Sequence, residues 1–348
     1  MTMATVEIRN LKKQFGSVQA VDGVDLSIRE GEMFVVLGPS GCGKTTLMRM
    51  IAGLEKPTSG EVWIGSQQVN DLPPRKREVA MVFQSYALYP HMSVFDNISF
   101  PLKAKKMPKQ EMREKVEWAA SIFGIQGLME RRPRQLSGGE RQRVALCRAM
   151  VKEPKVLLLD EPLSNLDAKL RLAARSELEM FQRRLGITTI FVTHDQIEAM
   201  ALGDRIVVMS AGKVMQVGTP QEIYHEPANI FVATFLGSPA INLLERDGRL
   251  VGFRPEHFLP QRGSDLRENL VIFPFDVVLV ENLGSDRLVY GHIVGSHEKQ
   301  LMAAKIPSIV TTPVEPGTTY EFVVERSRLR FFDKETAQRI EPVDGLIG

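Results

Sequence analysis

The sequence contains a glycine-rich loop whose residue types suit the binding of a polyphosphate. Gly38–Thr45 reads GPSGCGKT and has the spacing G-x-x-x-x-G-K-[ST]. Glycines let backbone N–H groups turn inward around phosphate oxygens, while Lys44 reaches the outer phosphates and the Thr45 hydroxyl ligates Mg²⁺. An apolar run, Met33–Leu37, precedes the loop and a helical run, Thr46–Ala52, follows it. We therefore predict a nucleoside triphosphate site, with these binding residues: Gly38, Pro39, Ser40, Gly41, Cys42, Gly43, Lys44, Thr45 and Thr46.

Two adjacent carboxylates follow another apolar run. Val156–Leu159 leads directly into Asp160 and Glu161. We assign Asp160 to the Mg²⁺ shell, as the acidic residue of such nucleotide hydrolases. Glu161 is placed one residue nearer the terminal phosphate, where it can accept a proton from an attacking water. Acidic pairs also occur at helix N-termini, but the apolar run that ends here favours the catalytic interpretation.

A second candidate phosphate-binding element reads LSGGE, at Leu136–Glu140. Ser137 is a candidate helix N-cap, and Gly138 with Gly139 allows the backbone to approach an anion at the positive end of the helix. On its own, such a segment is a common turn and cap. Each chain has one element of this kind and one glycine-rich loop.

The elements that position these residues follow from the hydrophobic pattern. Nearly continuous apolar runs are typical of strands buried on both faces of a parallel sheet, and we predict four: Met33–Leu37, Val79–Phe83, Val156–Leu159 and Thr189–Thr193. These runs stop at Gly38, Gln84, Asp160 and His194. Open α/β sheets bind ligands at the carboxyl ends of their strands. We therefore predict that the residues at these four strand ends lie in one binding site.

The remaining segments divide the chain. Helical patterns at Pro108–Phe123 and Ser137–Met150 indicate a helical insertion over about residues 85–152, and helices at Ala168–Leu185 and Gln196–Leu202 continue the α/β pattern. After about Leu236, strand-like runs recur between Gly, Pro and Ser turns. We predict an α/β domain over residues 1–236 and an all-β domain over 237–348.

Composition limits the class of protein. The 348 residues carry 44 Lys plus Arg and 42 Asp plus Glu, a net charge of +2 that gives no global field for nucleic acid. The apolar runs are shorter than the ~20 residues that a spanning helix needs. Two cysteines, Cys42 and Cys147, form no disulfide framework, which suits a reducing cytosol. We expect a soluble intracellular protein.

Together, these motifs resemble those of the ATP-binding cassette (ABC) family: Walker A at Gly38–Thr45, the LSGGE signature, and Walker B ending at Asp160. The resemblance implies further roles. Gln84 matches the Q-loop glutamine, which completes the Mg²⁺ shell and senses the membrane partner. Ser164–Asp167 resembles the D-loop, and Phe15 stands where an aromatic ring, usually Tyr, stacks on adenine. His194 resembles the switch histidine, which positions the terminal phosphate. The catalytic set that the resemblance implies is Glu161, His194, Lys44 and Gln84.

The family resemblance also implies an assembly. Two cassettes bind head to tail, and each ATP lies between Lys44 of one copy and Ser137 of the other. The implied fold is a P-loop ABC ATPase domain with a helical subdomain, followed by an OB-like accessory domain of the TOBE type.

Three further segments resemble the MalK-like importer cassettes: Gly252–His257 (GFRPEH), Val280–Gly284 (VENLG) and Pro90–Ile98. This resemblance implies import of a carbohydrate, sugar alcohol or glycerol phosphate, with two permease subunits, a solute-binding protein and no nucleic acid. The chain is then peripheral, on the cytoplasmic face of the bacterial inner membrane. Polyamine, sulfate and iron importers carry related domains. The nucleotide motifs also suit a soluble cassette ATPase of DNA repair or translation, or a nucleotide-gated regulatory protein.

Overall fold

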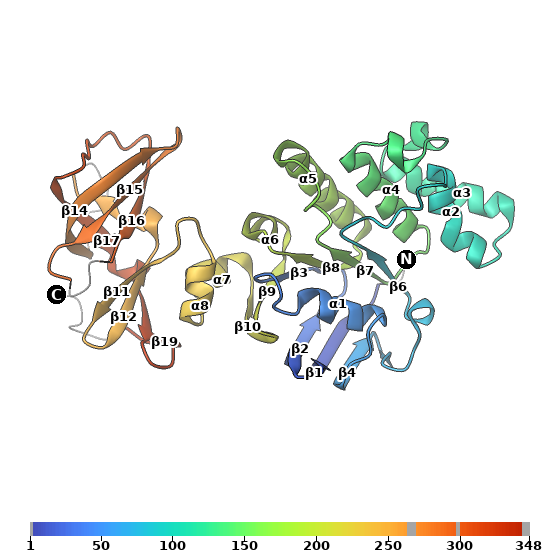
Figure 1. Ribbon diagram of the computed structural model, residues 1–348, viewed down its shortest axis with the longest axis horizontal. Coiled ribbons are helices and arrows are strands. Elements are labelled where there is room, and N and C mark those ends of the chain that lie inside the picture. Colours follow the sequence, from blue (N-terminus) through green and yellow to red (C-terminus); the bar gives the residue numbers. More distant parts are fainter. Residues whose placement is uncertain (1–2, 263–268, 297–299, 343–348) are drawn as a thin grey trace. The chain divides into compact units, whose positions relative to one another are not determined.

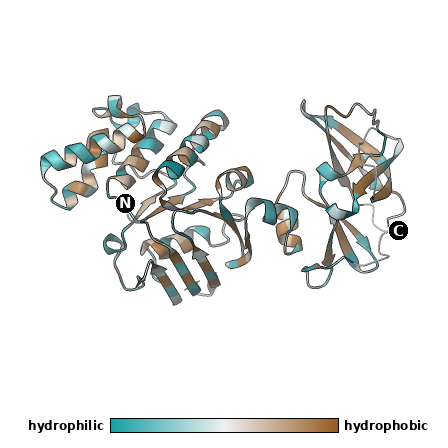
Figure 2. Ribbon diagram, turned by 180° about the vertical axis from the view of Figure 1, so that it is seen from behind, coloured by the Kyte–Doolittle hydropathy of each residue, from teal (hydrophilic) through white to brown (hydrophobic). Residues whose placement is uncertain are grey.

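The computed structural model describes residues 3–262, 269–296 and 300–342. These residues fall into two compact units that divide after Pro220 (Figure 1). Among these residues, every helix is too short or too polar to cross a membrane. Figure 2 shows that the strands of both units carry much of the hydrophobic sequence.

The first unit is built on a six-stranded sheet with the strand order β10-β9-β3-β8-β7-β6. All neighbouring strands are parallel except β9 and β10. The strands are β3 (Met33–Leu37), β6 (Val79–Val82), β7 (Val156–Asp160), β8 (Thr188–Thr193), β9 (Arg205–Ser210) and β10 (Lys213–Gly218). Leu37 pairs with Thr193, and Asp160 with Val192. The carboxyl ends of the strands predicted to carry the site therefore meet at one edge.

A second, antiparallel sheet with the order β2-β1-β4-β5 was not predicted from the sequence. Its strands are β1 (Val6–Phe15), β2 (Val18–Ile28), β4 (Ser59–Ile64) and β5 (Gln67–Gln68). One hydrophobic core joins this sheet, helix α1 (Lys44–Ala52) and one face of the parallel sheet. Helix α1, which starts at the glycine-rich loop, is thus fixed between two sheets.

Three helices form a separate hydrophobic core between β6 and β7, where the sequence predicts a helical insertion. They are α2 (Val94–Ala104), α3 (Lys109–Ile122) and α4 (Gly138–Met150). Pro108 and Ser137 occupy the N-cap positions of α3 and α4. Helix α5 (Ala168–Leu185) follows β7 and ends at Gly186 with φ 61°, and α6 (Gln196–Leu202) follows β8.

The second unit consists of two antiparallel sheets, with the orders β11-β12-β18-β19 and β13-β17-β14-β15-β16, and two short helices. Phe253, Phe258, Phe275 and Phe322 are buried in its core with their rings in contact. The elements are α7 (Pro220–His225), α8 (Ile230–Phe235), β11 (Asn242–Arg246), β12 (Arg249–Phe253), β13 (Leu259–Pro260), β14 (Leu270–Asn282), β15 (Asp286–Ile293), β16 (Met302–Pro307), β17 (Thr319–Glu325), β18 (Arg330–Asp333) and β19 (Arg339–Ile340).

The compact units divide after Pro220, whereas the sequence placed the division after Leu236. The physical reason is that the segment between these points binds to the C-terminal strands. Arg330 forms an ion pair with Glu226 at 2.5 Å, and Ile230 N donates to Ala337 O at 2.9 Å. Helices α7 and α8 therefore belong to the second unit.

Candidate active site

The glycine-rich loop connects β3 to α1 and adopts a backbone that only glycine accommodates at two points. Gly43 has φ 105°, and a Cβ there would lie 2.3 Å from the carbonyl oxygen of Ala20. A Cβ on Gly38 would lie 2.4 Å from the carbonyl oxygen of Met209. Such contacts are far inside van der Waals distance, so these glycines keep the loop close to its neighbours.

Lys44, the first residue of α1, is folded back onto this loop. Only 5% of it is exposed, and its ammonium donates to the carbonyl oxygens of Gly38 at 2.8 Å and Pro39 at 2.9 Å. The charge therefore lies at the helix N-terminus, where an anion is also favoured by the backbone N–H groups. Cys42 is buried beside it, and burial raises the pKa of this thiol, so the thiol is neutral at pH 7.

A cavity of about 370 Å³ lies on the loop. The start of β2, the glycine-rich loop with the first turn of α1, Glu161 and the β9–β10 turn form its walls. The lining residues are Val18, Gln19, Ala20, Ser40, Gly41, Gly43, Lys44, Thr45, Thr46, Glu161, Ala211 and Gly212. The predicted phosphate-binding loop and the predicted catalytic carboxylate thus face the same space.

Thr45 and Asp160 are joined by a hydrogen bond, Oγ1 to Oδ1, of 3.1 Å. Asp160 is 6% exposed, and burial raises the pKa of its carboxyl. A buried carboxylate next to a hydroxyl is an oxygen site that a divalent cation would stabilise. Mg²⁺ is held in nucleotide sites by one or two such groups together with phosphate and water, so this pair fits the ion.

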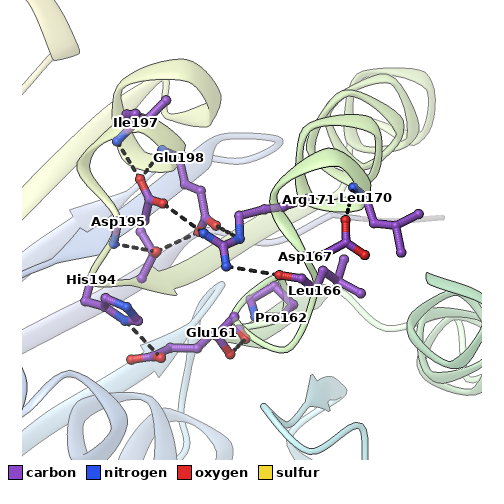
Figure 3. A network of polar contacts seen from close by, with 12 residues as sticks. Glu161, Pro162, Leu166, Asp167, Leu170, Arg171, His194, Asp195, Ile197 and Glu198 are labelled. Atoms are coloured by element: carbon purple, nitrogen blue, oxygen red, sulfur yellow. Dashed lines mark hydrogen bonds and ion pairs between the residues drawn. The ribbon is translucent and has the colours of Figure 1, made fainter. Parts of the chain in front are cut away.

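Glu161 contacts two of the predicted catalytic side chains. Its Oε2 lies 3.0 Å from Nδ1 of His194 and accepts from Nε2 of Gln84 at 3.3 Å. Glu161 has φ 46°, and its N–H donates to the carbonyl oxygen of Val192 at 3.0 Å. The strained backbone turns the side chain toward β8, where His194 follows the strand (Figure 3).

Gln84 lies beside Glu161 in the structure. Its Nε2 also contacts Ser164 Oγ at 3.2 Å, and its carbonyl oxygen accepts from Asn165 Nδ2 at 2.6 Å. The Q-loop is therefore tied to the turn that follows Walker B. In these contacts the Gln84 amide acts as a donor, which leaves its side-chain oxygen for the predicted role as a metal ligand.

Comparison with known proteins identifies the family of this chain. The family model described as ABC transporter matches residues 21–164. The sn-glycerol-3-phosphate import ATP-binding protein UgpC of Bordetella avium is 46% identical, over 97% of this chain and 99% of its own. The trehalose/maltose import ATP-binding protein MalK of Thermococcus litoralis is 44% identical, over 97% of this chain and 100% of its own. This chain belongs to the ABC transporter family.

The solved structures support the same fold for the first unit. The ATP-binding cassette MJ0796, in a dimeric post-hydrolysis state bound to ADP and Pi, matches with a TM-score of 0.56 and 33% identity. The match covers 62% of this chain and 98% of that one. The predicted fold class is confirmed: an α/β P-loop ABC ATPase domain with a helical subdomain, followed by an all-β, OB-like domain. The protein is an ATPase of this family.

The signature residues do not line the cavity of their own cassette among the described residues. Ser137 caps α4, and its Oγ accepts from Glu140 N at 3.3 Å while Glu140 Oε2 accepts from Ser137 N at 2.6 Å. A Cβ on Gly138 would lie 2.9 Å from Leu166 Cδ2, whereas a Cβ on Gly139 would meet nothing within 4 Å. The N-terminus of α4 is therefore ordered and open next to Gly139.

Of the other predicted binding residues, Asp167 and Phe15 also lie outside the cavity lining, as do Gly38, Pro39 and Cys42 of the glycine-rich loop. Asp167 caps α5 by accepting from Leu170 N at 2.9 Å. Phe15 ends β1 and is 46% exposed, with the Lys13 ammonium 4.6 Å from its ring centroid. Phe15 pairs with Val18, which does line the cavity. An exposed ring next to the cavity retains a free face for stacking on a base.

No sequence motif singles out Arg171, which the structure places next to these loops. Its guanidinium contacts the carbonyl oxygen of Leu166 and faces the carboxylates of Asp195 and Glu198 (Figure 3). An arginine in the first turn of an amphipathic helix is ordinarily a solvated residue. Only the tertiary structure shows that it lies between the D-loop and the residues after His194.

Proposed function

We propose that this chain is the ATP-hydrolysing subunit of a bacterial ABC importer, acting as a head-to-tail homodimer beneath two membrane permease subunits. Near-full-length identity of 44–46% to import ATP-binding proteins for glycerol phosphate and for trehalose/maltose carries this proposal. The proposed solute is a carbohydrate, sugar alcohol or glycerol phosphate, delivered by a solute-binding protein. The site of action is the cytoplasmic face of the inner membrane.

The residues of the cavity have distinct proposed roles. When ATP binds, the Lys44 ammonium leaves the loop carbonyl oxygens that it contacts in the free chain and contacts the outer phosphates instead. The backbone N–H groups of Gly41 and Gly43 donate to the same phosphates. Thr45, Asp160 and Gln84 hold Mg²⁺. When bound, this ion neutralises phosphate charge. Phe15 stacks on the adenine ring.

Hydrolysis requires a proton acceptor beside the attacking water. The Glu161 carboxylate lines the cavity and takes that proton on an Oε atom. His194, with a proton on Nδ1, donates to Glu161 Oε2 over 3.0 Å and holds the carboxylate in place. A carboxylate that is already hydrogen bonded is pre-organised for the reaction, so little reorganisation accompanies proton transfer.

The proposed dimer completes each site. Ser137 and Gly139 lie at an open helix N-terminus outside the cavity of their own chain, so they are available to the γ-phosphate of ATP on a second copy. Asp167, in the turn before α5, is proposed to face the same ATP from the partner. A phosphate bound by two chains links ATP binding to association.

The dimer is tested by sedimentation of the Glu161→Gln variant with and without Mg-ATP. We expect monomers without nucleotide and dimers with it, and the additional variant Ser137→Arg should remain monomeric. A chain that stays monomeric with saturating Mg-ATP would contradict the dimer.

The importer is tested by reconstituting the chain with its permease subunits in vesicles and measuring ATP-driven uptake. We expect uptake of labelled glycerol 3-phosphate or maltose. Uptake of a polyamine, sulfate or iron instead would replace the proposed solute class, and no ATP-driven uptake of any of them would contradict the importer assignment.

A further inference from the structure

Arg171 lies in the first turn of α5 and faces oxygen atoms of the turn before α5 and of the residues that follow His194. One Nη donates to the carbonyl oxygen of Leu166 at 3.0 Å, and the other lies 3.7 Å from Asp195 Oδ2. Nε lies 4.0 Å from Glu198 Oε1 (Figure 3). The planar guanidinium with five donors can serve all three groups at once, which a lysine ammonium on a flexible stem does less well.

On one side, Arg171 holds the turn before α5. Leu166 is 4% exposed and is followed by Asp167, the N-cap of the helix. The Leu166 side chain lies against Gly138 of the signature, since a Cβ on that glycine would be 2.9 Å away. A displacement of this turn therefore moves the carbonyl group that Arg171 binds.

On the other side, Arg171 faces the residues that follow His194. Asp195 caps α6 by accepting from the N–H groups of Ile197 and Glu198 at 2.8 and 3.2 Å. Its own N–H donates to Thr193 Oγ1 at 2.9 Å, and that hydroxyl donates to Glu198 Oε2 at 2.7 Å. His194 thus sits between two residues whose bonds form one closed network.

Glu198 is the buried carboxyl of this network, and it faces the Arg171 guanidinium at 4.0 Å. The residue is 4% exposed, and burial raises the pKa of its carboxyl. Arg171 supplies the positive charge facing it, and Arg171 Nε makes no hydrogen bond of its own among the described residues. An unused donor opposite a buried carboxylate leaves room for this contact to shorten when the site closes.

We propose that Arg171 is a positioning residue that holds His194 against Glu161 by joining the turn before Asp167 to the residues after His194. The inference rests on the proposed roles of Glu161 and His194 in hydrolysis. Through Arg171, a movement of the D-loop, which is proposed to face the partner cassette, displaces His194 and with it the catalytic carboxylate of the same chain. Arg171 does not line the cavity, and it acts through His194.

The experiment compares Arg171→Ala and Arg171→Lys with Arg175→Ala in the full-length chain. Arg175 lies one turn later on α5, and the structure records no hydrogen bond or ion pair from it to either loop among the described residues. We expect Arg171→Ala to lower kcat roughly ten- to a hundredfold, the effect of a small misplacement of a catalytic group. The dissociation constant for ATP should stay within about twofold, and Arg171→Lys should fall between Ala and wild type.

A double-mutant cycle with His194→Ala separates positioning from general stability. Single-turnover rates with labelled ATP resolve slow hydrolysis in these variants. We expect Arg171→Ala to change the rate little once His194 is absent, because residues that act through one another are not additive. Thermal denaturation of each variant identifies loss of folded protein, in which case Arg171→Lys carries the same test with a smaller change.

Equal rate losses from Arg171→Ala in the presence and absence of His194 would overturn the proposal, as would a loss equal to that of Arg175→Ala. Wild-type turnover in His194→Ala alone would overturn the proposal together with the catalytic role of His194. The two failures are therefore distinguishable.

Discussion

Nδ1 of His194 lies 3.0 Å from Oε2 of Glu161, so the side chains that follow two neighbouring strands, β8 and β7, meet at the cavity above the glycine-rich loop. The pairing of Asp160 with Val192 favours this contact, because it places Glu161 level with Thr193, the residue before His194. Catalytic geometry thus follows from strand register.

Glu161→Gln keeps the size of the side chain and removes the proton acceptor. We expect kcat to fall at least about a hundredfold, within the range of general base catalysis, with ATP affinity preserved. Phosphate release and binding of a fluorescent ATP analogue measure the two quantities. Glu111→Gln, the same change on the exposed surface of α3, should leave both unaltered. Hydrolysis near the wild-type rate in Glu161→Gln would remove Glu161 from this role.

Asp160→Asn should separate stability from function. The buried carboxylate has a raised pKa because burial disfavours its charge, so folding carries a cost at neutral pH that the neutral amide avoids. We expect the ligand-free Tm to rise by about 2–4 °C, the shift for ~1 kcal/mol in a unit of this size. The Tm increase on adding Mg-ATP should shrink, since the proposed metal ligand has lost its charge.

The matched control for this measurement is Asp71→Asn, whose carboxylate is 94% exposed. Its Tm should match wild type with and without nucleotide. A lower ligand-free Tm in Asp160→Asn, or full Mg-ATP stabilisation, would contradict the assignment.

Substitution by alanine should have different effects at Gly43 in the glycine-rich loop and at Gly139 in the signature. Gly43→Ala places a Cβ 2.3 Å from a carbonyl oxygen at φ 105°, so we expect a loss of roughly 1–3 kcal/mol in stability and of ATP binding. Gly139→Ala meets nothing within 4 Å, so folding and ATP binding by one chain should persist while turnover of the dimer falls. Thermal denaturation and ATP binding test both. Wild-type ATP binding by Gly43→Ala would show that the loop can move.

The elements that carry the predicted site residues follow local rules, so their positions can be read from the sequence. Helix α5 lies where Asp167 and Gly186 mark its ends, and four apolar runs are the strands β3, β6, β7 and β8 to within one residue at each end. Parallel pairing then brings their carboxyl ends together. The hydrophobic pattern therefore accounts for the structural proximity of Glu161 and His194, whereas their roles in hydrolysis remain predictions.

Other features depend on contacts between distant residues. Helix α2 contains Pro101, a residue that argues against a helix, and it is retained because Ile98 and Leu102 pack in the core with α4. Helices α7 and α8 join the second unit through strands about a hundred residues later, as with Glu226 and Arg330. Arg171 acquires its partners only when β8 and α5 are assembled.

Acid should weaken the second unit through two histidines. His225 and His257 stack with their ring centroids 6.4 Å apart, near Arg254, Arg328, Arg330 and Glu256, and burial lowers the pKa of both below 6.5. Nδ1 of His257 is buried without a hydrogen-bond partner among the described residues. Below about pH 6.5 the unfolded chain binds protons that the folded unit does not, so stability present above that pH is lost as the pH falls toward the folded pKa values.

We expect calorimetry to show the transition of the second unit falling by several degrees between about pH 7.5 and pH 5.5, roughly 2–4 °C for each kcal/mol lost. Calorimetry is needed because tryptophan fluorescence reports on the first unit, which contains both tryptophans, Trp63 and Trp118. His257→Gln should reduce this pH dependence, since the neutral amide takes up no proton in the unfolded chain. His91→Gln, a change at an exposed residue of the first unit, should retain it. An unchanged pH dependence in His257→Gln would place the acid sensitivity in other groups.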